Sequence, residues 1–179
     1  MSTQLELRLS GSGGQGLITA GIILAEAALK DDKNAIQTQS YGPEARGGAS
    51  KAEVIISSDV IDFPKVTLPN MTLALTQIAS DKYISDISED GTIIVDDSIV
   101  LPANIKAKHI YRVPIIKTAI NEVGKEIVAN IVALGLIVGL TGIVSEASLE
   151  AAIMSRIPKG TEDLNRLALQ KGYELAKSL

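Results

Sequence analysis

A glycine-rich turn between an alternating segment and a helical segment is the feature that most limits the fold of this chain. Residues 11–16 read GSGGQG and fit the pattern G-x-G-x-x-G. Before the turn, leucines alternate with charged residues over 4–10, which predicts a strand. After it, apolar residues recur with helical spacing over 15–30. We therefore expect a first strand that passes through a tight turn into a first helix, because glycine permits positive φ angles and close approach to the backbone.

Two interpretations of this turn are open. In the first, backbone amides and the helix dipole bind an anion, such as a phosphate, at the start of the helix. In the second, the turn needs small residues only for packing. A dinucleotide site usually has an acidic residue about 20 residues further on. Asp31 and Asp32 lie near that spacing, but they close the expected helix rather than end a second strand, which disfavours a nicotinamide dinucleotide. The candidate ligand residues of the turn are Gly11, Ser12, Gly13, Gly14, Gln15 and Gly16.

Strands and helices alternate along the rest of the chain. Further strands are expected at 35–40, 51–57, 71–76, 92–96 and 108–113. Helices are expected at 80–87 with Ser80 as N-cap, at 116–124, 126–140, 145–155 and 161–177, and in a short piece within 64–70. This alternation predicts an α/β fold of the Rossmann-like, doubly wound type, with a mostly parallel sheet flanked by helices in a single domain over residues 1–179.

A second loop, YGPEARGGAS at 41–50, follows the second expected strand. Ligands of doubly wound sheets bind at the carboxyl ends of the strands, so this loop and the glycine turn can share one crevice. An arginine there offers a planar fork of donors for phosphate or carboxylate, and the glycines let a ligand or a partner backbone lie close. The alternative is a solvated turn with an incidental Glu and Arg. The candidate residues are Tyr41, Glu44, Arg46, Gly47 and Gly48.

Composition excludes several classes of function. The chain has no cysteine, which excludes disulfides, thiolate catalysis and thiolate ligation of zinc or iron–sulfur clusters. A net charge of −4 without a basic block argues against duplex nucleic-acid binding. The single histidine, His109, gives little scope for a metal site, and no nucleophile–base pair is recognisable, so no catalytic or metal-ligating residue is expected. Asp96 and Asp97 are interpreted as turn or capping residues rather than as metal or ribose ligands.

Residues 127–144 carry no charge over 18 residues, the lower limit of a membrane-spanning helix. Asn130 and several glycines interrupt this segment, and Thr141-Gly142 predicts a helix end. We therefore expect a fully buried helix, with a subunit interface as one place for it. Gly135 and Gly139 would let another backbone come close. The N-terminus lacks the basic-then-apolar pattern of a signal peptide, so no membrane association is expected and the expected compartment is the cytoplasm.

Three stretches together resemble one protein family over essentially the whole chain. They are GSGGQG at the first turn, QTQSYGPEARGGASKAEVIIS after it, and NIVALGLIVGLTGIVS in the C-terminal third. The chain resembles the gamma subunit of 2-oxoacid:ferredoxin oxidoreductases, and TQSYGPEARGG is most similar to the 2-oxoglutarate branch, 2-oxoglutarate synthase.

The resemblance implies a role within a larger enzyme. Such enzymes decarboxylate a 2-oxoacid on thiamine diphosphate, transfer the acyl group to coenzyme A and pass electrons through iron–sulfur clusters to ferredoxin. The implied partners are the alpha and beta subunits, with a ferredoxin-like delta subunit as an open addition; they carry thiamine diphosphate, Mg and the clusters. The gamma subunit is associated with coenzyme A binding and with completing the active site, and is not expected to be active alone. An isolated chain could form a homodimer through surfaces meant for partners.

Two other functions are weighed against this one. A free-standing nucleotide or dinucleotide-binding module should bind NAD(P) alone, with an acidic residue at the end of its second strand. Here that strand ends in Gln39 and Ser40, which counts against it. A purely structural subunit would use the glycine turn only as a turn.

Overall fold

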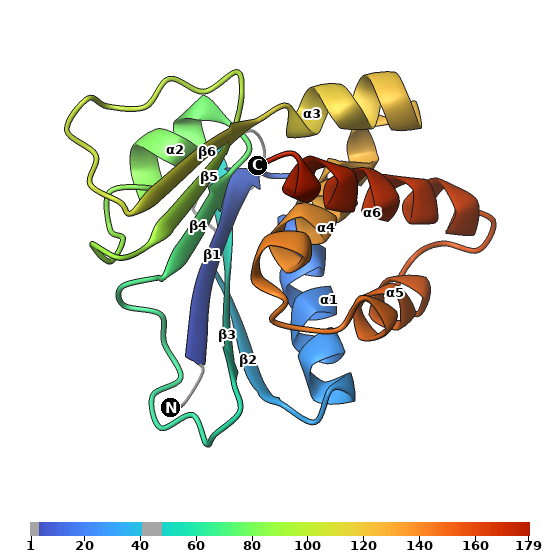
Figure 1. The fold of residues 1–179 in the computed structure, drawn as a ribbon, viewed down its shortest axis with the longest axis horizontal. Helices are drawn as coiled ribbons and strands as arrows, with labels where there is room; N and C mark the ends of the chain where they lie inside the picture. Colours follow the sequence, from blue (N-terminus) through green and yellow to red (C-terminus); the bar gives the residue numbers. More distant parts are fainter. Residues whose placement is uncertain (1–3, 41–47) are drawn as a thin grey trace.

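The computed structural model describes residues 4–40 and 48–179, which form a sheet covered by helices on both faces (Figure 1). The sheet has six strands in the order β2-β3-β1-β4-β5-β6. Their bounds are β1 Gln4–Ser12, β2 Asn34–Ser40, β3 Ala49–Ser57, β4 Met71–Ala74, β5 Thr92–Asp96 and β6 His109–Val113. The expected mostly parallel α/β sheet is confirmed.

One strand runs against the others. The pairs β1–β4, β4–β5 and β5–β6 are parallel, whereas β3 lies antiparallel between β1 and β2. Only eight residues separate Ser40, the end of β2, from Ala49, the start of β3, whereas a parallel neighbour would need a crossover of a dozen or more. As a result, Ser12 at the end of β1 pairs with Ala49 at the start of β3. The glycine turn and the start of β3 therefore lie at the same edge of the sheet.

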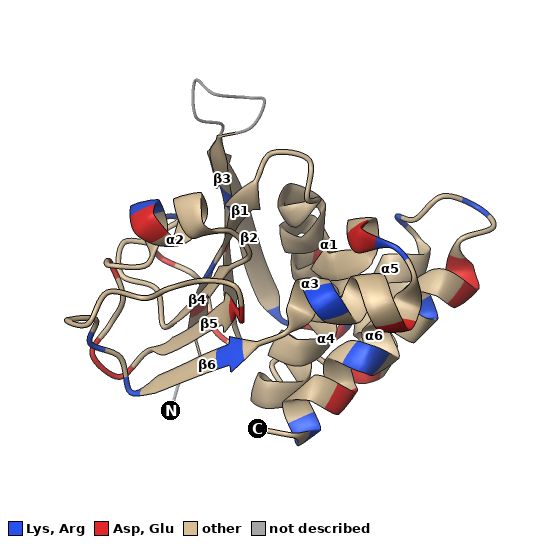
Figure 2. Ribbon diagram, turned by 90° about the horizontal axis from the view of Figure 1, so that it is seen from above, with Lys and Arg blue, Asp and Glu red and all other residues tan. Residues whose placement is uncertain are grey.

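The helices are divided unequally between the two faces. Their bounds are α1 Leu17–Lys30, α2 Gln77–Tyr83, α3 Ile115–Thr118, α4 Ala129–Thr141, α5 Glu146–Met154 and α6 Glu162–Lys177. Figures 1 and 2 show α1, α4, α5 and α6 on one face and α2 on the other. The main core lies between the sheet and the four-helix side, where Leu7, Leu9, Val54 and Ile56 of the strands pack on these helices.

Several expected helices differ in detail. Ser80 is not an N-cap but is buried inside α2, which begins after Thr76, whose hydroxyl accepts a hydrogen bond from the amide of Ala79 at 3.4 Å. Residues 64–70 form bends instead of a short helix. Pro64 and Pro69 lie in this segment, and a proline disfavours helical backbone at the residue before it. The helix expected at 116–124 is the short α3 followed by a π-helix, η1 Ala119–Val123. A 3-10 turn, η2 Glu126–Val128, precedes α4.

The charge-free segment is a buried helix, as expected. Residues 129–138 of α4 are all buried, and α6 of the same chain covers it closely. A Cβ on Gly135 would lie 2.5 Å from the carbonyl oxygen of Leu169, and one on Gly172 would lie 2.2 Å from that of Val132. Helix α4 thus belongs to this chain's own core rather than to a subunit interface. Within the described part of the chain, no helix is both long and apolar enough to cross a membrane.

Candidate functional site

The glycine turn leaves the sheet at its carboxyl edge and begins helix α1. Gly11 and Ser12 are the last residues of β1, and Gly16 is the N-cap of α1. Gly14 and Gly16 adopt left-handed backbone with φ values of 94° and 72°, which L side chains rarely adopt. The strand–turn–helix context that a phosphate-binding turn requires is therefore present.

Three amides of the turn are already bonded within the chain. The side-chain oxygen of Gln15 accepts a hydrogen bond from the amide of Ser12 at 2.8 Å, and the amide of Gln15 donates to the carbonyl of Ser12 at 3.2 Å. The amide of Gly13 donates to the carbonyl of Gly48, also at 3.2 Å. Gln15 thus stabilises the turn through two hydrogen bonds with Ser12. The amides of Gly14 and Gly16 bond to no other described residue.

The first turn of α1 adds further amide groups. Gly16 provides no side-chain cap, and the first turn has no acidic residue. The amides of Leu17, Ile18 and Thr19 have no intrahelical acceptor, because the first backbone bond of the helix runs from Ala20 to the carbonyl of Gly16 at 2.9 Å. These groups and the helix dipole make the turn attractive to an anion.

A distant residue holds the start of α1 in place. Asn130, at the beginning of α4, donates a hydrogen bond from its side-chain amide to the carbonyl of Gly16 at 3.2 Å. A Cβ on Gly16 would come within 2.6 Å of that amide nitrogen. Asn130 is only 8% exposed. It is a buried hydrogen-bonding group, as its place in a charge-free helix suggests, but the sequence gives no sign of its partner.

Of the second-loop candidates, Tyr41, Glu44, Arg46 and Gly47 lie outside the described residues. Gly48 is buried, and its carbonyl accepts the hydrogen bond from Gly13. The end of the second loop therefore touches the glycine turn, as expected for two loops at one edge of the sheet.

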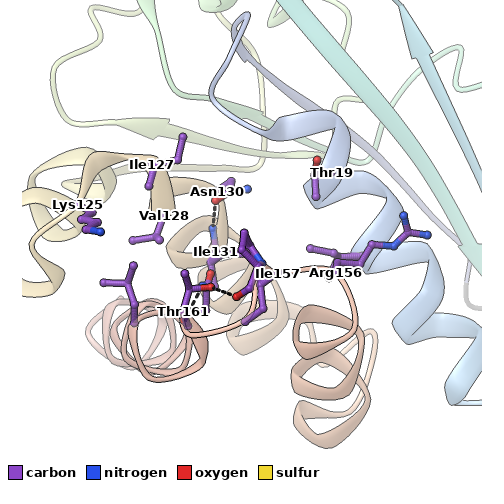
Figure 3. A pocket seen from close by; sticks show the side chains of 13 residues that line it. Thr19, Lys125, Ile127, Val128, Asn130, Ile131, Arg156, Ile157 and Thr161 are labelled. Carbon is purple, nitrogen blue, oxygen red and sulfur yellow. Dashed lines mark hydrogen bonds between the residues drawn. The ribbon is translucent and has the colours of Figure 1, made fainter.

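A cavity of about 240 Å³ opens beside the start of α1 (Figure 3). Thr19 lies on its α1 side and Asn130 on its α4 side, and Ile157 and Thr161 come from the segment between α5 and α6. Most of the lining is apolar, with Lys125 and Arg156 as the cationic members. Sequence patterns do not reveal this cavity, because its walls come from three segments that lie far apart in the chain.

The comparison with known families decides what kind of domain carries these loops. The family described as pyruvate ferredoxin/flavodoxin oxidoreductase matches residues 6–175. The chain belongs to this family.

Several relatives in this oxidoreductase family match along nearly their full length. The 2-oxoglutarate synthase subunit KorC of Methanocaldococcus jannaschii is 54% identical, with 97% of this chain and 95% of the relative covered. The pyruvate synthase subunit PorC of Methanothermobacter marburgensis is 32% identical over 97% of this chain and 98% of its own. A solved structure, the keto/oxoacid ferredoxin oxidoreductase gamma subunit from Geobacter sulfurreducens, is 50% identical with a TM-score of 0.87 and 98% of both chains covered. The resemblance to gamma subunits is confirmed.

Asp31 and Asp96, the acidic residues considered as possible ribose or metal ligands, make structural hydrogen bonds in this domain. Asp31 ends α1, at the opposite end from the glycine turn, and accepts hydrogen bonds from the hydroxyls of Ser145 at 2.8 Å and Ser148 at 2.5 Å. Asp96 is 1% exposed and accepts from the amides of Ser98 at 3.1 Å and Ile116 at 2.9 Å. These contacts support turn and capping roles.

His109 is exposed at the start of β6 and stacks on Tyr111 with ring centroids 6.1 Å apart. Among the described residues, no three His, Asp or Glu side chains gather in a way that could hold a metal ion.

Proposed function

We propose that this chain is the gamma subunit of a 2-oxoglutarate:ferredoxin oxidoreductase, which converts a 2-oxoacid to acyl-coenzyme A and reduces ferredoxin. The observation that carries the substrate assignment is the 54% identity to a 2-oxoglutarate synthase subunit, against 32% to a pyruvate synthase subunit of similar coverage. The substrate itself is expected to bind mainly to other subunits.

The chain's own task in this proposal is to bind coenzyme A. Coenzyme A contributes the thiol that accepts the acyl group. The free amides of Gly14 and Gly16, with those of the first turn of α1, suit one of its phosphate groups. Gly11, Ser12, Gly13 and Gln15 shape the turn. The facing wall of the site is assigned in this proposal to Tyr41, Glu44, Arg46, Gly47 and Gly48. No residue of this chain is assigned a catalytic role.

The remaining cofactors belong to partner subunits in this proposal. A chain without cysteine has no thiolates to ligate iron–sulfur clusters. Thiamine diphosphate with Mg, and the clusters, are assigned to alpha and beta subunits and to a ferredoxin-like delta subunit where there is one. The complex is expected in the cytoplasm, with ferredoxin as electron acceptor.

The alternative of a free-standing dinucleotide-binding module finds less support. Strand β2, NAIQTQS, contains no acidic residue, and Asp31 is occupied at the far end of α1. A module of that kind would bind NAD(P) as an isolated chain, whereas a subunit would be found with partners.

Two experiments test the proposal. The tagged chain is purified from its native host without oxygen, and co-purifying subunits are identified and assayed for coenzyme A-dependent 2-oxoglutarate oxidation. A chain that emerges alone with bound nucleotide would contradict the subunit assignment.

In the active complex, Arg46→Ala should raise the apparent KM for coenzyme A. If this variant assembles normally and its affinity for coenzyme A is unchanged, Arg46 does not bind coenzyme A. If the variant fails to assemble with its partner subunits, the second loop is a docking surface.

A further inference from the structure

We propose that Lys51 and Lys82, held around Tyr83, form a second anion subsite that binds the ribose 3′-phosphate of coenzyme A. This inference rests on the proposed function, because it assigns a second phosphate of the same ligand. The subsite lies on the α2 face of the sheet, near the carboxyl edge from which the glycine turn emerges. Figure 2 shows α2 beside the ends of β1 and β3 at that edge.

Tyr83 provides a fixed centre for the subsite. Its hydroxyl donates to the carbonyl of Ala49 at 3.4 Å, and its own carbonyl accepts from the guanidinium of Arg8 at 3.3 Å. The ammonium nitrogens of Lys51 and Lys82 lie 5.6 and 5.4 Å from the centroid of its ring. Both distances are within the range of cation–π attraction, so the ring keeps both positive charges beside it.

The cations of this cluster outnumber its carboxylates. Arg8 is 4% exposed and bonds to Glu53 at 2.8 Å, and Lys51 reaches the same Glu53 oxygen at 2.9 Å. One carboxylate thus serves two cations. Lys82 forms no ion pair with any described residue, and the neighbouring Asp81 accepts a hydrogen bond from Gln77 instead. An anion bound beside Tyr83 would offset this excess of positive charge.

The position of the cluster fits a ligand that carries two separate phosphate groups. Lys51 pairs with Ser10 in the sheet, three residues before Gly13 of the glycine turn. At about 3.3 Å per strand residue, the two places are ~10 Å apart along β1. Coenzyme A carries a pyrophosphate and, on its ribose, a separate 3′-phosphate. With the pyrophosphate at the glycine turn, the 3′-phosphate can reach the cluster, where flexible lysines serve as point charges.

The test compares coenzyme A with dephospho-coenzyme A, which lacks only the 3′-phosphate. Binding of each to the assembled complex is measured by calorimetry for the wild type and for Lys51→Gln and Lys82→Gln. We expect the wild type to prefer coenzyme A by about tenfold or more, as for one charge-assisted contact. Each substitution should bring this ratio towards one and leave dephospho-coenzyme A affinity unchanged. Lys65→Gln is the matched control, since it removes an exposed lysine from the loop at the opposite end of the strands.

Each outcome decides the inference. A preference that falls in both lysine variants but not in the control supports it, as does a preference that shrinks with added salt. An unchanged ratio in both variants overturns it. Equal weakening of both ligands also overturns it, as does failure of the variants to recruit partner subunits, which would make the cluster a docking surface. If the wild-type complex binds neither ligand, the proposed coenzyme A role fails as a whole.

Discussion

The side-chain amide of Asn130 donates a hydrogen bond to the carbonyl oxygen of Gly16 at 3.2 Å, although 114 residues separate the two in the chain. This contact fixes the N-terminus of α1 against the start of α4. The carbonyl of Gly16 also accepts the first backbone bond of α1, from Ala20. The orientation of the helix start, and hence of its free amides, therefore depends on a residue that touches no proposed ligand.

Asn130→Ala should loosen the glycine turn. The side chain donates to Gly16 and accepts from the amide of Ile131, and loss of these two hydrogen bonds is expected to lower the free energy of unfolding by about 1–2 kcal/mol. The affinity for coenzyme A should fall with it. Chemical denaturation and calorimetry measure the two effects. Asn104→Ala, at an exposed position, is the control and should change stability by less than ~0.5 kcal/mol.

Gly16→Ala should be rescued in part by Asn130→Ala. In the wild-type background, the new Cβ would meet the Asn130 amide at 2.6 Å, in addition to the strain of a φ of 72°. Removing the amide removes the collision but not the strain. A double-mutant cycle should therefore give a coupling energy of roughly 1 kcal/mol, while strict additivity would show that the two residues act independently.

The close packing of α4 on α6 predicts graded effects of alanine. Gly172→Ala places a Cβ 2.2 Å from a backbone oxygen and should lower the free energy of unfolding by about 3 kcal/mol. Gly139→Ala places a Cβ 2.6 Å from the Cβ of Ala176, but this contact lies near the ends of both helices, where the last turns can move apart, and alanine adds helix propensity. Its loss of stability should therefore be smaller, about 1–2 kcal/mol. Equal effects in thermal or denaturant unfolding would contradict this account.

Asp96→Ala should destabilise the chain much more than Asp97→Ala. The first change leaves the amides of Ser98 and Ile116 without their acceptor at a buried site and is expected to cost about 2–4 kcal/mol. The second mainly removes an ion pair with the exposed Lys117, worth up to ~1 kcal/mol. Urea denaturation distinguishes the two. Similar losses would show that the cap at the start of α3 is unimportant.

The link between Asp31 and α5 should weaken in acid. Burial opposes the charge of Asp31, but hydrogen bonds from Ser148 and Ser145 outweigh it and lower the pKa of this carboxyl below its ordinary value of 3.8. A lowered folded-state pKa adds stability above pH 3.8 that is lost as the pH falls through the lower folded-state pKa. The Tm of the wild type should therefore exceed that of Asp31→Asn at pH 7. The difference in Tm should disappear as the pH falls below 3.8 and through the folded-state pKa. A difference in Tm that stays the same at every pH would contradict this account.

Local sequence signals predicted the first half of the site well. Alternating leucines, the glycine turn and helical spacing gave β1, the turn and α1, because each depends on neighbouring residues. The buried state of α4 followed from its lack of charge. The pairing of Asn130 with Gly16 and the gathering of Lys51 and Lys82 around Tyr83 could not be predicted, because they depend on how distant elements pack. The π-helix after α3 also has no local signature in the sequence.

The bond between Asn130 and Gly16 also sets an order of events during synthesis. The glycine turn leaves the ribosome early, but its anchor lies 114 residues later, and α4 is itself buried only once α6 has been made. Contacts of such long sequence separation form late, because the chain between them must first be ordered. The glycine turn therefore reaches its supported conformation only after α6 has been made. A truncated product that lacks α6 would present the glycine turn without its support.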